Sequence, residues 1–356
     1  MAKIFLDQQN VECAVYGGAV LGGGGGGWIE EGLQIGHLAV EVGPPQLVTI
    51  DELADEDLVV AVSLVGAPGA PEKYVNPIHY AKALDLLRRQ MKRSIHGITT
   101  NENGAGTTVN GWFQAAVSQL PVIDCPCNGR AHPTGLMGSL NLSELPDYVT
   151  YQAAVGGKKD RYLELSLSGS LSKAAAMVRR ASVEAGGMVA VARNPVTAAY
   201  ARENGAPGAI RQAMAVGEKW LSNQGEAAIA AVVDYLGGRV IVEGKVTDFS
   251  IQMENGFDIG TACIEEQYEI TFWNEYMTLE KQGERLATFP DLMMTFDAQT
   301  GRPIVSAALT KGQRIVLIVV PRKNLILSKT MQNRNLLQTV ETIIHKKIVA
   351  FLSVDV

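Results

Sequence analysis

Predicted strands alternate with amphipathic helices through the first 124 residues, and this alternation restricts the chain to few folds. The β-branched run at residues 58–65 is typical of a strand buried on both faces. Residues 77–91 carry apolar side chains at three- and four-residue spacing, which predicts one face of a helix. Shorter strands are predicted at 47–50, 95–99 and 121–124. This order predicts a parallel sheet between helices, a three-layer αβα domain.

The second half of the chain has a different pattern. From residue 239 onward, short apolar strands are separated by glycine and polar turns, which is typical of an antiparallel sheet or a small barrel. Residues 339–352 have helical periodicity and are expected to cover an open sheet edge. A length of 356 residues suits two domains at roughly 150 residues each. We therefore predict an αβα domain at 1–166 and a mainly β, barrel-like domain with a helical insertion at 167–356.

Composition argues against several classes of partner. The chain has 37 acidic and 31 basic residues, a net charge of −6, without the Lys and Arg clusters of a nucleic-acid surface. No apolar run approaches the ~18 residues of a membrane span, and the N-terminus lacks the pattern of a secretory signal. Four Cys in such a chain indicate reduced thiols. We expect a cytoplasmic protein that binds a small molecule and neither nucleic acid nor membrane.

Six consecutive glycines occupy Gly22 to Gly27. Glycine lets backbone N–H groups approach an anion closely, and a helix that starts after the run adds a favourable partial charge. The run lacks the Lys and Ser/Thr of a nucleotide P-loop and follows a helix-like stretch, so nucleotide binding is disfavoured. Two interpretations stay open. Either Gly23, Gly24, Gly25 and Gly26 bind a small substrate, or the run is a tight turn beneath another element.

A second group of reactive side chains follows the strand predicted at 121–124. It consists of Asp124, Cys125, Cys127, Arg130 and His132. Thiol, imidazole and carboxylate groups are donors that Zn²⁺ prefers, although C-x-C differs from the C-x₂-C of common structural zinc sites. A thiol could instead act as a nucleophile with the histidine as its base. The third interpretation is a structured loop with buried thiols and a hydrogen-bonded histidine.

The loop after the strand predicted at 95–99 carries Glu102 and Asn103 beside glycines. Because the carboxyl ends of parallel strands share one sheet edge, this loop is expected near the cysteine loop. Glu102 suits a general base or metal ligand, and Asn103 suits a substrate-orienting group. The alternative is an Asx-rich turn that caps the following helix. Two polar breaks beside later strands, Asn274–Glu275 and Pro290–Asp291, are interpreted as turns.

Taken together, these segments resemble one family along nearly the whole chain, the S-methyl thiohydantoin desulfurase family. The matching stretches are Gly17 to Gly32, Glu102 to Gly106, Pro121 to Pro133, Gly208 to Trp220, Thr271 to Glu280 and Leu286 to Gly301. The resemblance implies an αβα N-terminal domain, a β-barrel-like C-terminal domain and a place in pathways that open hydantoin-type rings. The chain departs from the family pattern after Asp124, where thiol and amide replace acids.

These observations predict a metal-dependent hydrolase that acts on a small cyclic thiohydantoin-like or imide-like ring, with water attacking a ring carbon. The predicted ligands of a divalent metal, zinc by preference, are Asp124, Cys125, Cys127 and His132. Glu102 is then base or ligand, and Arg130 neutralises developing charge. Two alternatives stay open: a metal-free hydrolase with a cysteine nucleophile, and a non-catalytic subunit that assembles with a hydantoinase-type enzyme. A homo-oligomer is the base-rate expectation.

Overall fold

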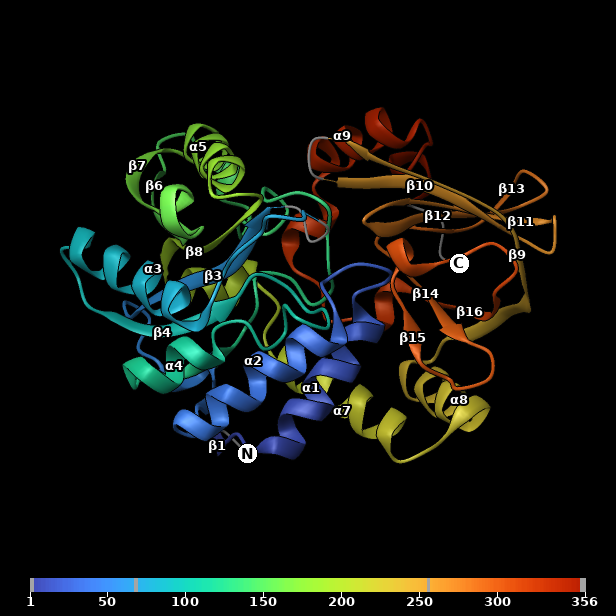
Figure 1. The fold of residues 1–356 in the computed structure, drawn as a ribbon, viewed down its shortest axis with the longest axis horizontal. Coiled ribbons are helices and arrows are strands. Elements are labelled where there is room, and N and C mark those ends of the chain that lie inside the picture. The colour runs from blue at the N-terminus through green and yellow to red at the C-terminus, as the bar shows by residue number, and fades with distance from the viewer. Residues whose placement is uncertain (1–2, 67–69, 255–256, 353–356) are drawn as a thin grey trace.

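Two eight-stranded sheets, one mixed and one antiparallel, lie side by side (Figure 1). The computed structural model describes residues 3–66, 70–254 and 257–352. The arrangement confirms the predicted fold class, an α/β N-terminal part followed by a mainly β C-terminal part.

The first sheet has the strand order β1-β2-β5-β4-β3-β8-β6-β7. Its strands are β1 (Lys3–Phe5), β2 (Gln46–Thr49), β3 (Leu58–Gly66), β4 (Ile95–Thr100), β5 (Val122–Asp124), β6 (Val149–Gly156), β7 (Leu163–Ser170) and β8 (Met188–Thr197). The neighbours β2, β5, β4 and β3 run parallel, as predicted. The strands β8, β6 and β7 pair antiparallel beside β3 and lie after the predicted strand–helix alternation of residues 1–124. The sheet is therefore mixed rather than parallel throughout.

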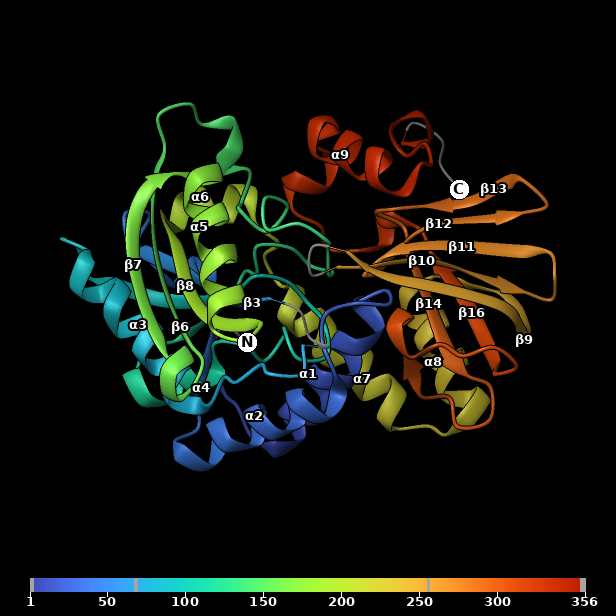
Figure 2. The ribbon, with the colours of Figure 1, turned by 45° about the horizontal axis from the view of Figure 1, so that its top comes forward.

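Helices cover both faces of the first sheet (Figure 2). The helices on one face are α1 (Gln8–Leu21), α2 (Ile29–Val42), α3 (Pro77–Gln90) and α4 (Trp112–Ser118), and those on the other are α5 (Leu171–Glu184) and α6 (Ala198–Asn204). Successive side chains of a strand point to opposite faces, so Val60 and Val62 of β3 pack with the first group. Val59 and Ala61 pack with α6. This alternation is the reason that the β-branched run forms a central strand.

The second sheet is antiparallel, with the order β13-β12-β11-β10-β9-β16-β14-β15. Its strands are β9 (Arg239–Glu254), β10 (Phe257–Ile264), β11 (Tyr268–Trp273), β12 (Glu275–Lys281), β13 (Glu284–Thr288), β14 (Leu292–Asp297), β15 (Pro303–Ile304) and β16 (Arg314–Val320). The helix α8 (Gly225–Leu236) packs against β14 and β16. The helix α9 (Arg334–Ile344) packs on Trp273 and Met277, so the predicted C-terminal helix covers a sheet face and not an edge.

The helix α7 (Ala209–Leu221) joins the two halves, because it packs against α1 and also contributes Val216 to the core of the second sheet. Its contact with α1 requires two glycines. A Cβ on Gly17 would lie 1.7 Å from the carbonyl oxygen of Ala213, and one on Gly217 would lie 1.8 Å from that of Cys13. The helices therefore touch backbone to backbone, which fixes the first sheet against the second.

The predicted boundary after residue 166 falls inside β7, and the first sheet continues to Thr197 in β8. The division into 1–166 and 167–356 as folding units stays a prediction. Within residues 3–66, 70–254 and 257–352, no helix is long and apolar enough to cross a membrane.

Candidate functional site

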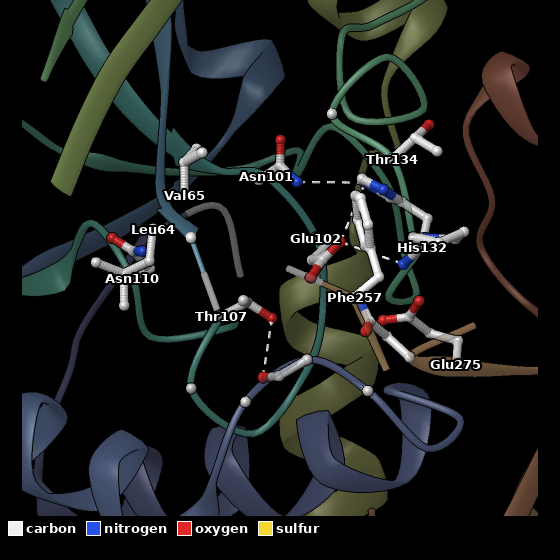
Figure 3. A pocket seen from close by; sticks show the side chains of 18 of the residues that line it. Leu64, Val65, Asn101, Glu102, Thr107, Asn110, His132, Thr134, Phe257 and Glu275 are labelled. Atoms are coloured by element: carbon white, nitrogen blue, oxygen red, sulfur yellow. Dashed lines mark hydrogen bonds and ion pairs between the residues drawn. The ribbon is translucent and has the colours of Figure 1, made fainter. Parts of the chain in front are cut away.

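A cavity of about 460 Å³ lies where loops of both sheets meet (Figure 3). The first sheet contributes the loop after β4 and the loop after β5, and the glycine run forms a further part of the wall. The second sheet contributes the residues around Phe257, Glu275 and Ser306. A volume of this size suits a small molecule, since ligand pockets span roughly 300–1,000 Å³.

Glu102 and His132 are in direct contact on the cavity wall (Figure 3). The Nε2 atom of His132 lies 3.1 Å from Oε2 of Glu102, and the backbone N–H of His132 donates to the same oxygen at 3.2 Å. The Nδ2 atom of Asn101 lies 3.3 Å from Nε2 of His132, and Nη2 of Arg193 donates to Oδ1 of Asn101 at 3.0 Å. The two loops that the sequence places at one sheet edge therefore meet there.

Burial moves the pKa values of this pair in opposite directions. Burial raises the pKa of Glu102 to about 8, against the lowering effects of the His132 backbone N–H and the charge of Arg193. Burial, with the charge of Arg193, lowers the pKa of His132 to about 3. The histidine is thus neutral at physiological pH, and Glu102 exchanges its proton close to that pH. Such values suit general acid–base chemistry.

Glu275 is a second buried carboxyl group on the cavity wall. It is the first residue of β12, and its Oε2 atom has no hydrogen-bond partner in the part of the chain that the structure describes. Burial raises its pKa well above the usual value, and the negative charge of Glu102 raises it further. The predicted turn is therefore wrong for Glu275. The sequence signal that could have identified Glu275 as a buried group is its place between the aromatic residues Trp273 and Tyr276.

Arg130 is fully buried behind the cavity. Its Nη1 atom donates to the carbonyl oxygens of Pro290 at 3.0 Å and Asp291 at 2.6 Å, and its guanidinium lies 4.6 Å from the ring centre of Phe289. Burial lowers its pKa to about 10, although the charge of Glu275 opposes that shift. Arg130 therefore does not line the cavity, and its predicted role in neutralising developing charge stays a prediction.

The glycine run packs against the loop after β4 and against Glu275. The Gly26 carbonyl oxygen accepts from the N–H of Gly106 at 2.9 Å, and that of Gly24 accepts from Ser306 at 2.8 Å. Gly26 has φ +81°, and a Cβ there would lie 2.4 Å from Cα of Gly104. The run is thus a turn beneath another loop, and Gly24 to Gly27 also line the cavity. Direct binding of substrate by Gly23 to Gly26 stays a prediction.

Two family models together match most of the chain. A model of the N-terminal domain of the S-Me-THD-like family matches residues 9–163, and a model of its C-terminal domain matches residues 170–333. The chain belongs to the S-Me-THD-like family. Both family domains contribute to the cavity, the first through Glu102 and His132 and the second through Glu275.

A protein from Chromobacterium violaceum, known from an X-ray crystal structure, has the same fold as this S-Me-THD-like chain, with a TM-score of 0.73. The two are 17% identical, and the similarity covers 96% of this chain and 97% of that chain. This likeness supports the fold alone. No curated protein matches the chain.

The four predicted zinc ligands of this S-Me-THD-like chain do not come together. The Asp124 carboxylate accepts from the N–H of Ile210 at 2.9 Å and pairs with Nε of Arg211 at 3.0 Å, so it stabilises the start of α7. The Cys125 thiol faces the carbonyl oxygen of Ala201 at 3.3 Å. In the described ranges, no three His, Cys, Asp or Glu side chains are placed to hold a metal ion. The predicted metal set therefore does not assemble in these ranges, since Asp124 is bonded to the start of α7 and Cys125 faces α6.

The two thiols of the loop are buried in an apolar cluster and do not line the cavity. Burial raises the pKa of Cys127 to about 12 and also raises that of Cys125. A thiol with such a pKa is protonated near neutral pH, and the thiolate is the nucleophilic form. This environment favours the interpretation as a structured loop with buried thiols.

Asn103 also lies away from the cavity lining. Its Nδ2 atom donates to the carbonyl oxygens of Gly129 at 3.2 Å and Ala209 at 2.7 Å, and its Oδ1 atom accepts from Thr108 at 3.3 Å. These bonds join the loop after β4 to the loop after β5 and to α7. Asn103 thus anchors the loop that carries Glu102, and the asparagine of this loop that lines the cavity is Asn101. Substrate binding by Asn103 stays a prediction.

We expect Asp124→Asn to lower the free energy of unfolding by about 1–3 kcal/mol, because a buried charge-assisted contact is lost. Urea denaturation measures this change. In the folded variant kcat should be unchanged, since Asp124 does not line the cavity. Unchanged stability with a collapsed kcat would place Asp124 in the catalytic machinery instead.

Proposed function

We propose that this S-Me-THD-like protein hydrolyses a small thiohydantoin-type ring, with Glu102 activating water. The observation that carries the proposal is the buried contact of Glu102 with His132 on the cavity wall. The family name points to thiohydantoin chemistry, and the cavity volume suits a single ring with a short substituent.

In the proposed reaction, ionised Glu102 takes a proton from water while the water oxygen attacks the ring carbon that bears sulfur. The carbon–sulfur bond then breaks and the electron pair leaves with sulfur. Glu275, which burial and the charge of Glu102 keep protonated, donates a proton to the departing thiolate. Glu102 passes its proton to the ring nitrogen. As the ring carbon becomes a carbonyl, its hydroxyl proton returns to Glu275 and replaces the proton given to the thiol, so both carboxyl groups are restored. Each catalytic cycle therefore releases one thiol and one hydantoin-type ring.

His132 has a positioning role in this scheme. Its backbone N–H and its Nε2 atom both contact Glu102, and the side chain of Asn101 lies beside the same Nε2 atom. When Glu102 is protonated, its O–H donates to Nε2 of His132. When Glu102 is ionised, it accepts from a protonated Nε2. The contact therefore persists in both protonation states of Glu102.

The pH dependence of thiol release tests the assignment of Glu102. Since the base must be ionised and its pKa is raised to about 8, kcat should rise with pH through about 8. The measurement is the initial rate of thiol release from an S-methyl thiohydantoin between pH 5 and pH 10, a range chosen to bracket that pKa. A rate that is already maximal at pH 5 would contradict the assignment.

Replacement of Cys127 by alanine separates this proposal from cysteine catalysis. We expect kcat to be retained and the free energy of unfolding to fall by about 1 kcal/mol, because a small cavity forms in the core. Alanine at Cys125, the neighbouring buried thiol, is the matched control. Loss of thiol release in either folded variant would favour a cysteine nucleophile.

A further inference from the structure

Two arginines on the cavity wall form no ion pair with a carboxylate of the described residues. Arg179 comes from α5 and Arg193 from β8, and both line the cavity. Neither forms an ion pair with any residue in the described ranges, whereas Arg180, the next residue of α5, pairs with Glu184 at 2.7 Å. The lack of a partner is thus a feature of the cavity side of α5.

Arg193 is nearly inaccessible, with 5% of its surface exposed. Its Nη2 atom donates to Asn101, and its Nε atom has no partner among the described residues. The charge of Glu102 acts on Arg193 without an ion pair between them, and a buried guanidinium that lacks a direct anionic partner is costly. An anion that enters the cavity and pairs with Arg193 therefore lowers this cost.

Arg179 lies over the ring of Phe257, with Cζ 4.9 Å from the ring centre. Stacking on an aromatic face holds a guanidinium in place without neutralising it. Burial lowers the pKa of Arg179, and burial together with the positive charge of Arg179 lowers the pKa of Arg193. The two cations therefore repel each other across the wall in the absence of an anion.

We propose that Arg179 and Arg193 form a subsite for a carboxylate carried on the side chain of the substrate ring, an inference that rests on the proposed function for the ring itself. A carboxylate matches the planar fork of a guanidinium. A doubly charged phosphate is disfavoured, because Glu102 and Glu275 line the same cavity.

The subsite adjoins the catalytic pair. A single side chain separates them, since Asn101 contacts His132 through Nδ2 and accepts from Arg193 through Oδ1. A ring held at Glu102 can therefore reach the arginines with a short acidic side chain. The substrate class is a thiohydantoin with a short carboxylate-bearing substituent.

Calorimetric titration with two unreactive rings tests this subsite. The probes are hydantoin-5-acetate and its uncharged amide, hydantoin-5-acetamide. The wild-type protein should prefer the acetate, and Arg179→Met should raise the Kd of the acetate about 10- to 100-fold, as expected when one charge-assisted contact is lost. The Kd of the amide should be unchanged. Arg180→Met is the matched control and should bind both probes as the wild type does.

Equal affinity of the wild-type protein for the two probes, or a lack of binding by both, would overturn the subsite. So would an equal weakening of both by Arg179→Met. Arg193→Lys, which keeps the charge but loses the fork, should weaken the acetate alone. Because the probes are not turned over, the result is independent of thiol release. Arg179-dependent acetate binding without thiol release would refute the proposed function and leave the subsite standing.

Discussion

Replacement of Glu102 by glutamine is expected to lower kcat for thiol release about 1000-fold, within the range that general acid–base catalysis contributes. Glutamine has the shape of glutamate, and its oxygen can still accept from the backbone N–H of His132. The variant therefore loses the base and keeps the loop contacts. Steady-state kinetics with an S-methyl thiohydantoin measures the change.

Glu31→Gln is the matched control for this experiment. Glu31 also lines the cavity, but its carboxylate is half exposed and pairs with Lys73 at 2.9 Å. Its replacement should leave kcat nearly unchanged. A Glu102→Gln variant with wild-type kcat, or equal losses in the two variants, would contradict a specific role of Glu102 as base.

The same substitution has a predicted effect on stability. The folded protein keeps the proton of Glu102 up to a pH of about 8, whereas an unfolded chain releases it near 4.5. Wild-type stability is therefore lost as pH rises from 4.5 through about 8, and glutamine removes this loss. At pH 8 Glu102→Gln should unfold at a higher temperature than the wild type, and its free energy of unfolding should be larger by on the order of a few kcal/mol. This difference in stability should disappear near pH 4.5.

Gly26→Ala should lower the free energy of unfolding by about 2–4 kcal/mol and abolish most activity. Two independent penalties add at this position. The backbone has φ +81°, which residues other than glycine rarely adopt. The new Cβ would also lie 2.4 Å from Cα of Gly104. The loop that carries Glu102 would have to move away from the glycine run.

Gly27→Ala separates these two penalties. Gly27 has φ +89°, but a Cβ there would lie 3.3 Å from its nearest neighbour, the N atom of Gly106. It should therefore show the conformational cost with little displacement of the Glu102 loop. Denaturant unfolding and kcat are measured on both variants. Equal effects at the two positions would show that the close approach at Gly26 does not matter.

The local pattern of apolar residues in the sequence predicts the strands that bury apolar side chains on both faces. The run around Val60 forms the central strand β3, since its alternate residues enter two different cores. The strand β6 is less visible, because Gln152, Ala153 and Ala154 carry little β-sheet signal, and its place is fixed by pairing with β7 and β8. Tertiary pairing therefore decides the antiparallel half of the first sheet.

The candidate site was predictable only in part. Glu102 and His132 follow neighbouring parallel strands, so their meeting at one edge follows from topology. The direction of the Asp124 carboxylate depends on the start of α7 at Ile210, which no local pattern near Asp124 reveals. Glu275 and Arg193 arrive from distant strands, and their burial is a property of the assembled fold.

The most direct test of the central claim is hydrolysis of an S-methyl thiohydantoin by the purified chain in ¹⁸O-labelled water, followed by mass spectrometry of the ring product. The account predicts release of one thiol for each ring and one ¹⁸O atom on the carbon that carried sulfur, with both lost in Glu102→Gln. Contradiction would come from a ring product without ¹⁸O, or from thiol release that requires a hydantoinase-type partner.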